Sequence, residues 1–204
     1  MRRFARLLAR ALDFVLPRAD SARLVNEAGS DALARLVSPR ADDGIVSLLP
    51  YRHPLVRAAV LEAKFHDFSK ATHLLASAFR EYLPALEEER ALSKLPLAFV
   101  PVPLSEVRLR ARGYNQVERV LAAAGITSTH ALTRVRDTAP QTTLPRAKRL
   151  ENMEGAFRAD AGIDTNATYV LVDDVTTTGA TLRTARRSLE DAGAADVICL
   201  ALSH

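Results

Sequence analysis

Residues 169–201 constrain the fold more than any other part of this chain. The apolar run Tyr169–Val172 predicts a buried strand, and Thr181–Ala192 carries apolar residues at the spacing of one helix face. Gly193 ends that helix, and Val197–Ala201 predicts a second buried strand. A strand, a turn, a helix and a strand in this order form a βαβ unit, whose two strands run parallel. The sequence therefore predicts an α/β fold with a mainly parallel central sheet flanked by helices.

The composition is that of a soluble globular protein. The chain has 204 residues, 48% hydrophobic and 25% charged, which suits one domain with at most a small appendage. Cys199 is the single cysteine, so an internal disulfide and a zinc site made of cysteines alone are excluded. The net charge of +4 does not by itself indicate a nucleic-acid partner. It is unevenly divided, because residues 101–150 carry a net charge of +6 and residues 151–204 a net charge of −5.

Other segments predict further helices and one more strand. Leucine spacing over residues 54–86 predicts two helices joined around His66–Phe68, and residues 116–124 predict another helix. The apolar run Leu95–Leu104 predicts a buried strand that ends in a proline-stiffened loop. The polar, proline-punctuated residues 129–158 predict a long functional or mobile loop.

The amino-terminal segment begins with two arginines but does not match a secretory signal. Arg6, Arg10 and Asp13 interrupt its apolar run, which predicts a short amphipathic helix that packs on the core. No apolar stretch in the sequence is long enough to span a membrane. We therefore expect a cytoplasmic protein.

The residues that suggest chemistry follow the first strand of the βαβ unit. Asp173 and Asp174 come at its carboxyl end, and open α/β sheets bind ligands at that edge. The next turn contains threonines and Gly179, so its amide groups and the start of the following helix can surround an anion. A sugar phosphate satisfies both features, because the turn binds its phosphate and the carboxylates accept hydrogen bonds from its hydroxyls. Such a ligand can bring Mg²⁺ with it.

Two other interpretations explain less. A phosphoacceptor pocket of receiver type needs its acidic pair on the first strand, whereas only 30 residues follow Asp174. A helix cap accounts for one threonine but not for the aspartates and Gly179 together. A Walker-type loop is excluded because no Gly-Lys-Ser or Gly-Lys-Thr occurs in the chain.

The segment VLVDDVTTTGAT (Val170–Thr181) resembles the phosphoribosyl pyrophosphate (PRPP) loop of type I phosphoribosyltransferases. Three further segments resemble the ComF (ComFC/GntX-like) family of these proteins. They are VLEAKF (Val60–Phe65), FVPVPL with RGYNQ (Phe99–Leu104 and Arg112–Gln116), and TAPQ with a following RLENMEGAF (Thr138–Gln141 and Arg149–Phe157). The resemblance covers roughly residues 50–204 and implies a type I phosphoribosyltransferase fold with a small N-terminal helical hood region.

The resemblance also implies roles for individual residues. Asp173 and Asp174 would hold the ribose hydroxyls as the catalytic pair, in the presence of Mg²⁺ that PRPP carries. The remaining implied residues fall into three groups: Thr176, Thr177, Thr178, Gly179, Ala180 and Thr181 for PRPP binding; Val102, Pro103, Leu104 and Arg112 for the pyrophosphate loop; and Gln141, Arg149 and Asn152 for a flexible loop.

One departure from the family is evident. ComF proteins typically carry a Cys-x-x-Cys zinc ribbon after a Leu-Phe-Pro, but Val15-Leu16-Pro17 is followed here by Arg18 without a cysteine. The histidines lack metal-ligand spacing, so no zinc is expected. We divide the chain into residues 1–50, an N-terminal helical or hood segment without the ribbon, and residues 51–204, a phosphoribosyltransferase-like core.

Two functions follow from the resemblance. The first is a Mg²⁺-dependent phosphoribosyltransferase that displaces pyrophosphate from ribose C1 with an acceptor that the sequence does not identify. The alternative is a non-catalytic PRPP-binding protein or an accessory protein of competence and DNA uptake, since a fold does not imply an activity. The basic residues 101–150 leave a single-stranded DNA partner open, although Tyr114 is the only aromatic residue among them. A homodimer is also left open.

Overall fold

Two apolar strands near the carboxyl end form the centre of the molecule. The computed structural model describes residues 18–136 and 155–204, and the two strands are β6 (Thr168–Val175) and β7 (Asp196–Ser203). They pair in parallel, with Tyr169 opposite Val197. The connection between them is α8 (Ala180–Asp191), so the predicted βαβ unit is confirmed.

Three further strands extend the sheet on both sides, in the order β1-β2-β7-β6-β3. β3 (Leu97–Pro101) pairs in parallel with β6, and β2 (Ile45–Leu49) pairs in parallel with β7. The exposed edge strand β1 (Arg40–Asp42) is antiparallel to β2. Because β2, β7, β6 and β3 share one direction, their carboxyl ends meet at one edge of the sheet.

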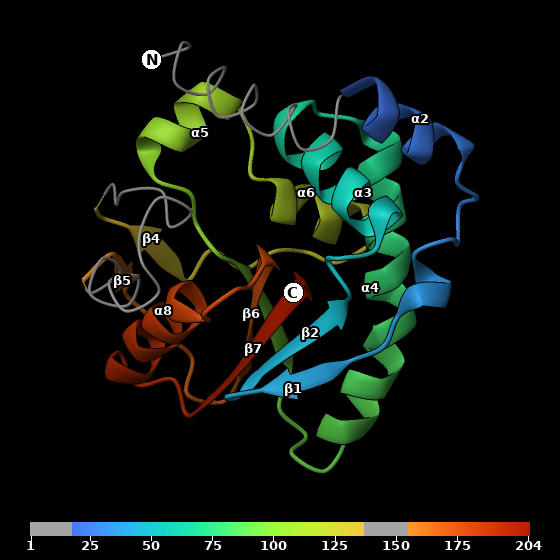
Figure 1. Ribbon diagram of the computed structural model, residues 1–204. Helices are drawn as coiled ribbons and strands as arrows, with labels where there is room; N and C mark the ends of the chain where they lie inside the picture. Colours follow the sequence, from blue (N-terminus) through green and yellow to red (C-terminus); the bar gives the residue numbers. More distant parts are fainter. Residues whose placement is uncertain (1–17, 137–154) are drawn as a thin grey trace.

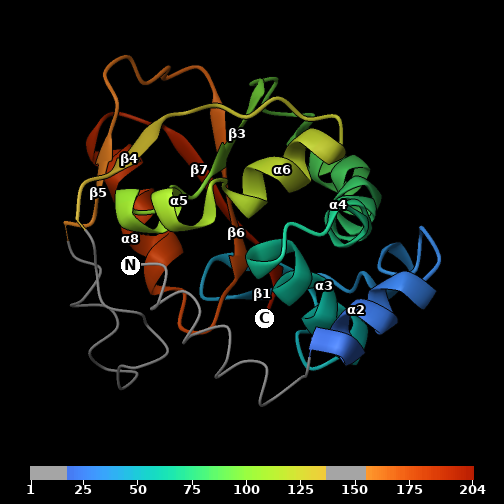
Figure 2. The same cartoon turned by 90° about the horizontal axis from the view of Figure 1, so that it is seen from above.

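Helices cover both faces of this sheet (Figures 1 and 2). On one face lie α4 (Ser69–Arg90) and α6 (Gln116–Ala123), with α3 (Pro54–Phe65) and α2 (Arg18–Glu27) packed against α4. On the other face lie α8 and a small antiparallel sheet. The remaining elements are β4 (Leu132–Arg134) and β5 (Phe157–Ala159) of that small sheet, the 3₁₀ helix η1 (Ala34–Leu36), and α5 (Glu106–Arg112).

Side-chain alternation along β6 explains why both faces need cover. Val170 and Val172 belong to the core beneath α4 and α6, whereas Leu171 belongs to the core beneath α8. All three are fully buried, and so is Cys199 of β7, which serves as a small core residue. Strands buried on both faces are apolar without interruption, which is the pattern visible in the sequence.

Several predicted elements are confirmed. The segment 54–86 forms α3 and α4 with the break at residues 66–68, and α6 begins at Gln116. Gly125 follows α6 in the left-handed conformation, with φ of 82°. At this level the prediction of a mixed α/β protein with a mostly parallel central sheet between helices is confirmed.

Three details differ from the predictions. β6 runs on to Val175, which was expected to begin the turn, so the two aspartates lie inside the strand just before its last residue. The segment 129–158 includes β4 and β5, which are only three residues each and gain their stability by packing on α8. Residues 40–49, grouped by the sequence with segment 1–50, form β1 and β2 of the central sheet. A run as short as Ile45–Leu49 becomes recognisable as a strand only through its pairing with β7.

Two other predictions fall on residues 1–17 and 137–154. The amphipathic helix expected within residues 1–17 and the flexible-loop residues Gln141, Arg149 and Asn152 lie outside the described residues. In residues 18–136 and 155–204, no helix combines the length and apolar character needed to cross a membrane.

Candidate functional site

The turn between β6 and α8 is held in place by its glycine and by an arginine of the helix. Gly179 has φ of 70°, a left-handed conformation that side-chain-bearing residues rarely adopt. A Cβ at this position would overlap Cδ1 of Ile45 in β2 and lie 2.8 Å from Nη1 of Arg183. Arg183 in turn donates hydrogen bonds to the carbonyl of Thr178 and, at 2.6 Å, to Oδ2 of Asp43. The turn therefore has a fixed shape before any ligand arrives.

This turn offers hydroxyl and amide groups to solvent. Thr177 is exposed, and Thr176, Thr178 and Thr181 are half-buried, whereas Gly179 and Ala180 are buried. The Thr178 hydroxyl accepts a hydrogen bond from the Ala180 amide at 3.5 Å. The first amides of α8 have no carbonyl partner within their own helix, so this end of the helix suits an anion.

Asp174 is a buried carboxylate whose oxygens are already occupied. Its Oδ2 accepts from Nζ of Lys64 at 2.6 Å and from Nε2 of Gln116 at 2.8 Å, and its Oδ1 accepts from the Val175 amide at 2.8 Å. Burial alone would raise the pKa of Asp174, but the charge and hydrogen bond of Lys64, with smaller contributions from Arg112 and Gln116, lower it below its ordinary value. Asp174 is therefore ionised and strongly bound by the protein itself.

Asp173 has a different environment. It is half-buried, and its Oδ1 accepts a hydrogen bond from the Asp174 amide at 2.9 Å. Burial and then the neighbouring charge of Asp174 raise the pKa of Asp173 to about 7, against the pull of Lys64. Of the two predicted ribose-binding carboxylates, Asp173 is the more accessible one.

The connection between α5 and α6 leads to Gln116, one of the three partners of Asp174. The guanidinium of Arg112 lies 5.6 Å from the centre of the Phe65 ring and donates a hydrogen bond to Oε1 of Gln116. That bond orients the Gln116 amide so that its nitrogen faces Asp174. Gly113, with φ of 87°, ends α5 and lets the chain turn toward α6.

The same connection is tied to two other parts of the molecule. The Tyr114 hydroxyl donates to the carbonyl of Ala63 at 2.8 Å and accepts from the amide of Asp67 at 2.9 Å, at the end of α3. Asn115 caps α6 and donates from Nδ2 to the carbonyl of Val102 at 3.0 Å. Within the RGYNQ segment, Arg112 and Gln116 thus act on Asp174, while Tyr114 and Asn115 fix the connection to α3 and to the end of β3.

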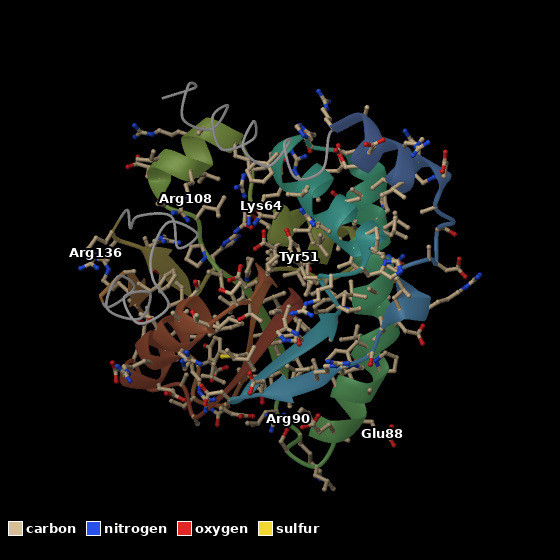
Figure 3. The ribbon with its side chains drawn as sticks, viewed as in Figure 1. Tyr51, Lys64, Glu88, Arg90, Arg108 and Arg136 are labelled. Atoms are coloured by element: carbon tan, nitrogen blue, oxygen red, sulfur yellow. The ribbon has the colours of Figure 1, made fainter. Side chains whose placement is uncertain are left out.

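The predicted pyrophosphate-loop residues lie on one side of this arrangement. Val102 follows β3 directly, is buried, and donates its amide to the carbonyl of Val172 at 2.9 Å. Pro103 and Leu104 follow, half-buried, and lead into α5. Figure 3 shows Lys64 above the carboxyl ends of the central strands and Arg108 on the facing helix α5. Cationic side chains from α3 and α5 therefore lie on the side of the sheet edge at which the two aspartates are found.

Among the described residues, the structure brings together the turn 176–181, the aspartate pair, Arg112 and the residues 102–104. Sequence reasoning named Lys64 and Gln116 only as parts of matched segments and did not predict their contact with Asp174. A lysine in the last turn of a mostly apolar helix was the available signal, but its partner is distant in sequence.

A metal cage made only of protein side chains is not present in the described part of the chain, where no group of three or more metal-binding side chains occurs. Mg²⁺ commonly binds through one or two carboxylates together with substrate phosphates and water. The accessible carboxylate of Asp173, with the adjacent Asp174, fits a metal that arrives on a phosphorylated ligand, and the aspartate pair would hold the ion there.

These features define the chain as an α/β protein with an acidic pair and a hydroxyl-rich turn at the carboxyl edge of a mostly parallel sheet. It is 33% identical to the DNA utilization protein YhgH of Salmonella typhimurium over 160 residues, covering 75% of this chain and 68% of that protein. It is 38% identical to competence protein ComFC of Streptococcus pneumoniae over 99 residues, covering 48% of this chain and 44% of ComFC. The chain belongs to the ComFC-like family. No family model matches it.

Proposed function

We propose that this chain is an accessory protein of DNA uptake or DNA utilization that binds PRPP at the carboxyl edge of its sheet. The names of its relatives, competence protein ComFC and DNA utilization protein YhgH, support the biological setting. The match spans less than half of ComFC, so activity and partners of the whole relative are part of the proposal. A type I phosphoribosyltransferase fold, with the hood formed by the N-terminal region, is proposed with it.

The arrangement around Asp173 is the observation that carries this proposal. The preformed turn 176–181 begins two residues after the aspartate pair and offers hydroxyls and helix amides for the 5′-phosphate of PRPP. Asp173 is the accessible acceptor for ribose hydroxyls. Lys64 contacts Asp174 at 2.6 Å, and the charge of Arg112 also lowers the pKa of Asp174, so these two cations suit a diphosphate. Mg²⁺ held by the aspartate pair and PRPP would neutralise part of the diphosphate charge.

Titration calorimetry tests the binding proposal. We expect PRPP to bind in the presence of Mg²⁺, and ribose 5-phosphate and inorganic pyrophosphate to bind more weakly, because each fills only part of the site. Asp173→Asn should lower the PRPP affinity at least tenfold, or about 1.4 kcal/mol. The exposed Asp42 of β1, replaced by asparagine, is the matched control and should bind as the wild type does. Absence of any PRPP binding by the wild type would contradict the proposal.

A Mg²⁺-dependent phosphoribosyltransferase is the second candidate function. In this reaction the carboxylate of Asp173 would offset positive charge that develops on the sugar ring. In the reaction, an acceptor forms a bond to C1 of ribose, the bond from C1 to the pyrophosphate oxygen breaks, and the acceptor loses a proton to solvent. A screen for pyrophosphate release over free bases and amines decides this. Binding of PRPP without release on any acceptor favours the accessory protein.

A single-stranded DNA partner and a homodimer remain proposals of the same kind. The basic surface of α5 supports the first, but Tyr114 cannot serve as a free stacking platform because the guanidinium of Arg119 lies 4.0 Å from its ring centre. Binding to DNA through phosphate contacts should weaken steeply with salt, which the same titration at two ionic strengths measures.

A further inference from the structure

We propose that Lys64 is an internal counter-ion that holds Asp174 in the unliganded protein and is exchanged for the divalent cation when a sugar polyphosphate binds. This inference rests on the proposed function, because it concerns the same site. It explains how a site whose buried carboxylate is already occupied can still accept a metal-bound ligand.

The contacts of Asp174 are the first step. Val175, Lys64 and Gln116 occupy three of the roughly four acceptor positions of its two oxygens, and Oδ2 is filled, so a metal ion reaches Oδ2 of Asp174 only when Lys64 or Gln116 leaves. The Val175 amide belongs to the backbone of β6 and cannot move away. The side-chain oxygen of Gln116 accepts a hydrogen bond from Arg112, whose guanidinium packs against the Phe65 ring, so Gln116 is held in place. Lys64 is therefore the partner that can move.

The exposure of the pair supports this assignment. The Lys64 side chain is 28% exposed, whereas that of Asp174 is 7% exposed. A lysine has a flexible stem, and its ammonium has three donors. Within the part of the chain that the structure describes, the ion pair shown for Lys64 is the one with Asp174. The ammonium thus borders solvent at the open side of the site, and a short movement would bring it to an anion bound there.

The charges at the site favour exchange of the Lys64 ammonium for another cation over its simple removal. Removing the ammonium would leave a buried carboxylate without its counter-ion beside a second carboxylate, which is strongly unfavourable. A divalent cation can replace the ammonium, because carboxylates and phosphate oxygens are its preferred ligands. The displaced ammonium can then pair with the phosphates. Cation and polyphosphate should consequently bind together, and each should bind poorly alone.

The Lys64→Met variant tests this directly, with Mg²⁺ alone as the probe. Methionine keeps an unbranched side chain of similar length without the charge, so the place of the ammonium becomes available. We expect the Tm of this variant to rise by about 3 °C at a Mg²⁺ concentration about tenfold above its Kd. The wild type and Lys94→Met, a charge-removing control at an exposed lysine, should show no such rise. Lys64→Met with Asp174→Asn should abolish the response.

A second variant covers the case in which Lys64→Met does not fold. Lys64→Arg keeps the charge but places a broad, bidentate guanidinium on Asp174 that a small cation displaces less readily. We expect its affinity for PRPP with Mg²⁺ to fall about tenfold while its fold is retained. A purely structural ion pair would leave that affinity unchanged.

The outcomes separate the two proposals. If the wild type binds PRPP but Lys64→Met ignores Mg²⁺, or Lys64→Arg binds PRPP with Mg²⁺ like the wild type, counter-ion exchange is wrong and the proposed function stands. If the wild type binds no PRPP, the proposed function is wrong. The response of Lys64→Met to Mg²⁺ alone still decides whether the ammonium occupies a cation site.

Discussion

At the scale of single residues, two adjacent aspartates with the same side chain have opposite electrostatic states. Asp174 is stabilised as an anion by Lys64, whereas burial and the charge of Asp174 make ionisation of Asp173 unfavourable. Neighbouring carboxylates that differ in this way are typical of functional sites, where affinity for a ligand is retained at some cost in stability.

The raised pKa of Asp173 predicts a pH-dependent stability. The folded protein keeps a proton on Asp173 up to about pH 7, whereas the unfolded chain loses it near pH 4, the ordinary value of 3.8. The contribution of Asp173 is therefore fully present below pH 4 and is lost as the pH rises through about 7.

Asp173→Asn should remove that loss. We expect the variant to exceed the wild type in unfolding free energy by about 1–3 kcal/mol at pH 8 and by much less at pH 5. Thermal melts at the two pH values measure this, with Asp42→Asn as the control. An equal difference at both pH values would show that Asp173 is not the titrating group.

At the scale of elements, the unit β6-turn-α8 combines local sequence signals with one contact from a distant strand. Its apolar run, its glycine and its amphipathic helix are all local, and they predicted the unit to within a few residues. The fit of Gly179 against Ile45 of β2 is not local, and no sequence pattern indicates it.

Replacing Gly179 by alanine should therefore have two costs. The left-handed backbone contributes one, and the overlap with Ile45 the other, so we expect a loss of about 2–3 kcal/mol in unfolding free energy and weaker PRPP binding. Gly193→Ala, at the other end of α8, shares the positive φ but has nothing within 4 Å of its added Cβ. It should cost only about 1 kcal/mol and leave binding unchanged. Equal losses in urea unfolding of the two variants would argue against the contact with Ile45.

The elements also show where sequence reasoning stops. α3, α4 and α6 carry their own periodicity and terminal residues, and they were predicted. β1, β2, β4 and β5 are short strands whose stability comes from pairing and packing with distant segments, and they were missed. The network around Asp174 was missed for the same reason, since it joins residue 64, residues 112–116 and residue 174 only in three dimensions.

At the scale of the whole molecule, the central sheet is continuous across residue 50, where the sequence places a boundary. β2 lies inside the sheet between β1 and β7, and Leu48 and Leu49 of β2 belong to the core with α4. The candidate site depends on the same strand, because the side chain of Ile45 packs against the turn at Gly179.

A fragment of residues 51–204 distinguishes a separate N-terminal segment from an integral one. Without β2 the fragment would expose the edge of β7 and open a void beside α4, so we expect it to lack a cooperative unfolding transition in urea. In the full chain, Leu48→Ala should lose about 2–5 kcal/mol, because its side chain is fully buried. Val46→Ala is the matched control in the same strand, where a half-buried side chain should cost less. A fragment that unfolds cooperatively and binds PRPP would instead show that residues 51–204 form an independent domain, with β2 contributing only an additional strand.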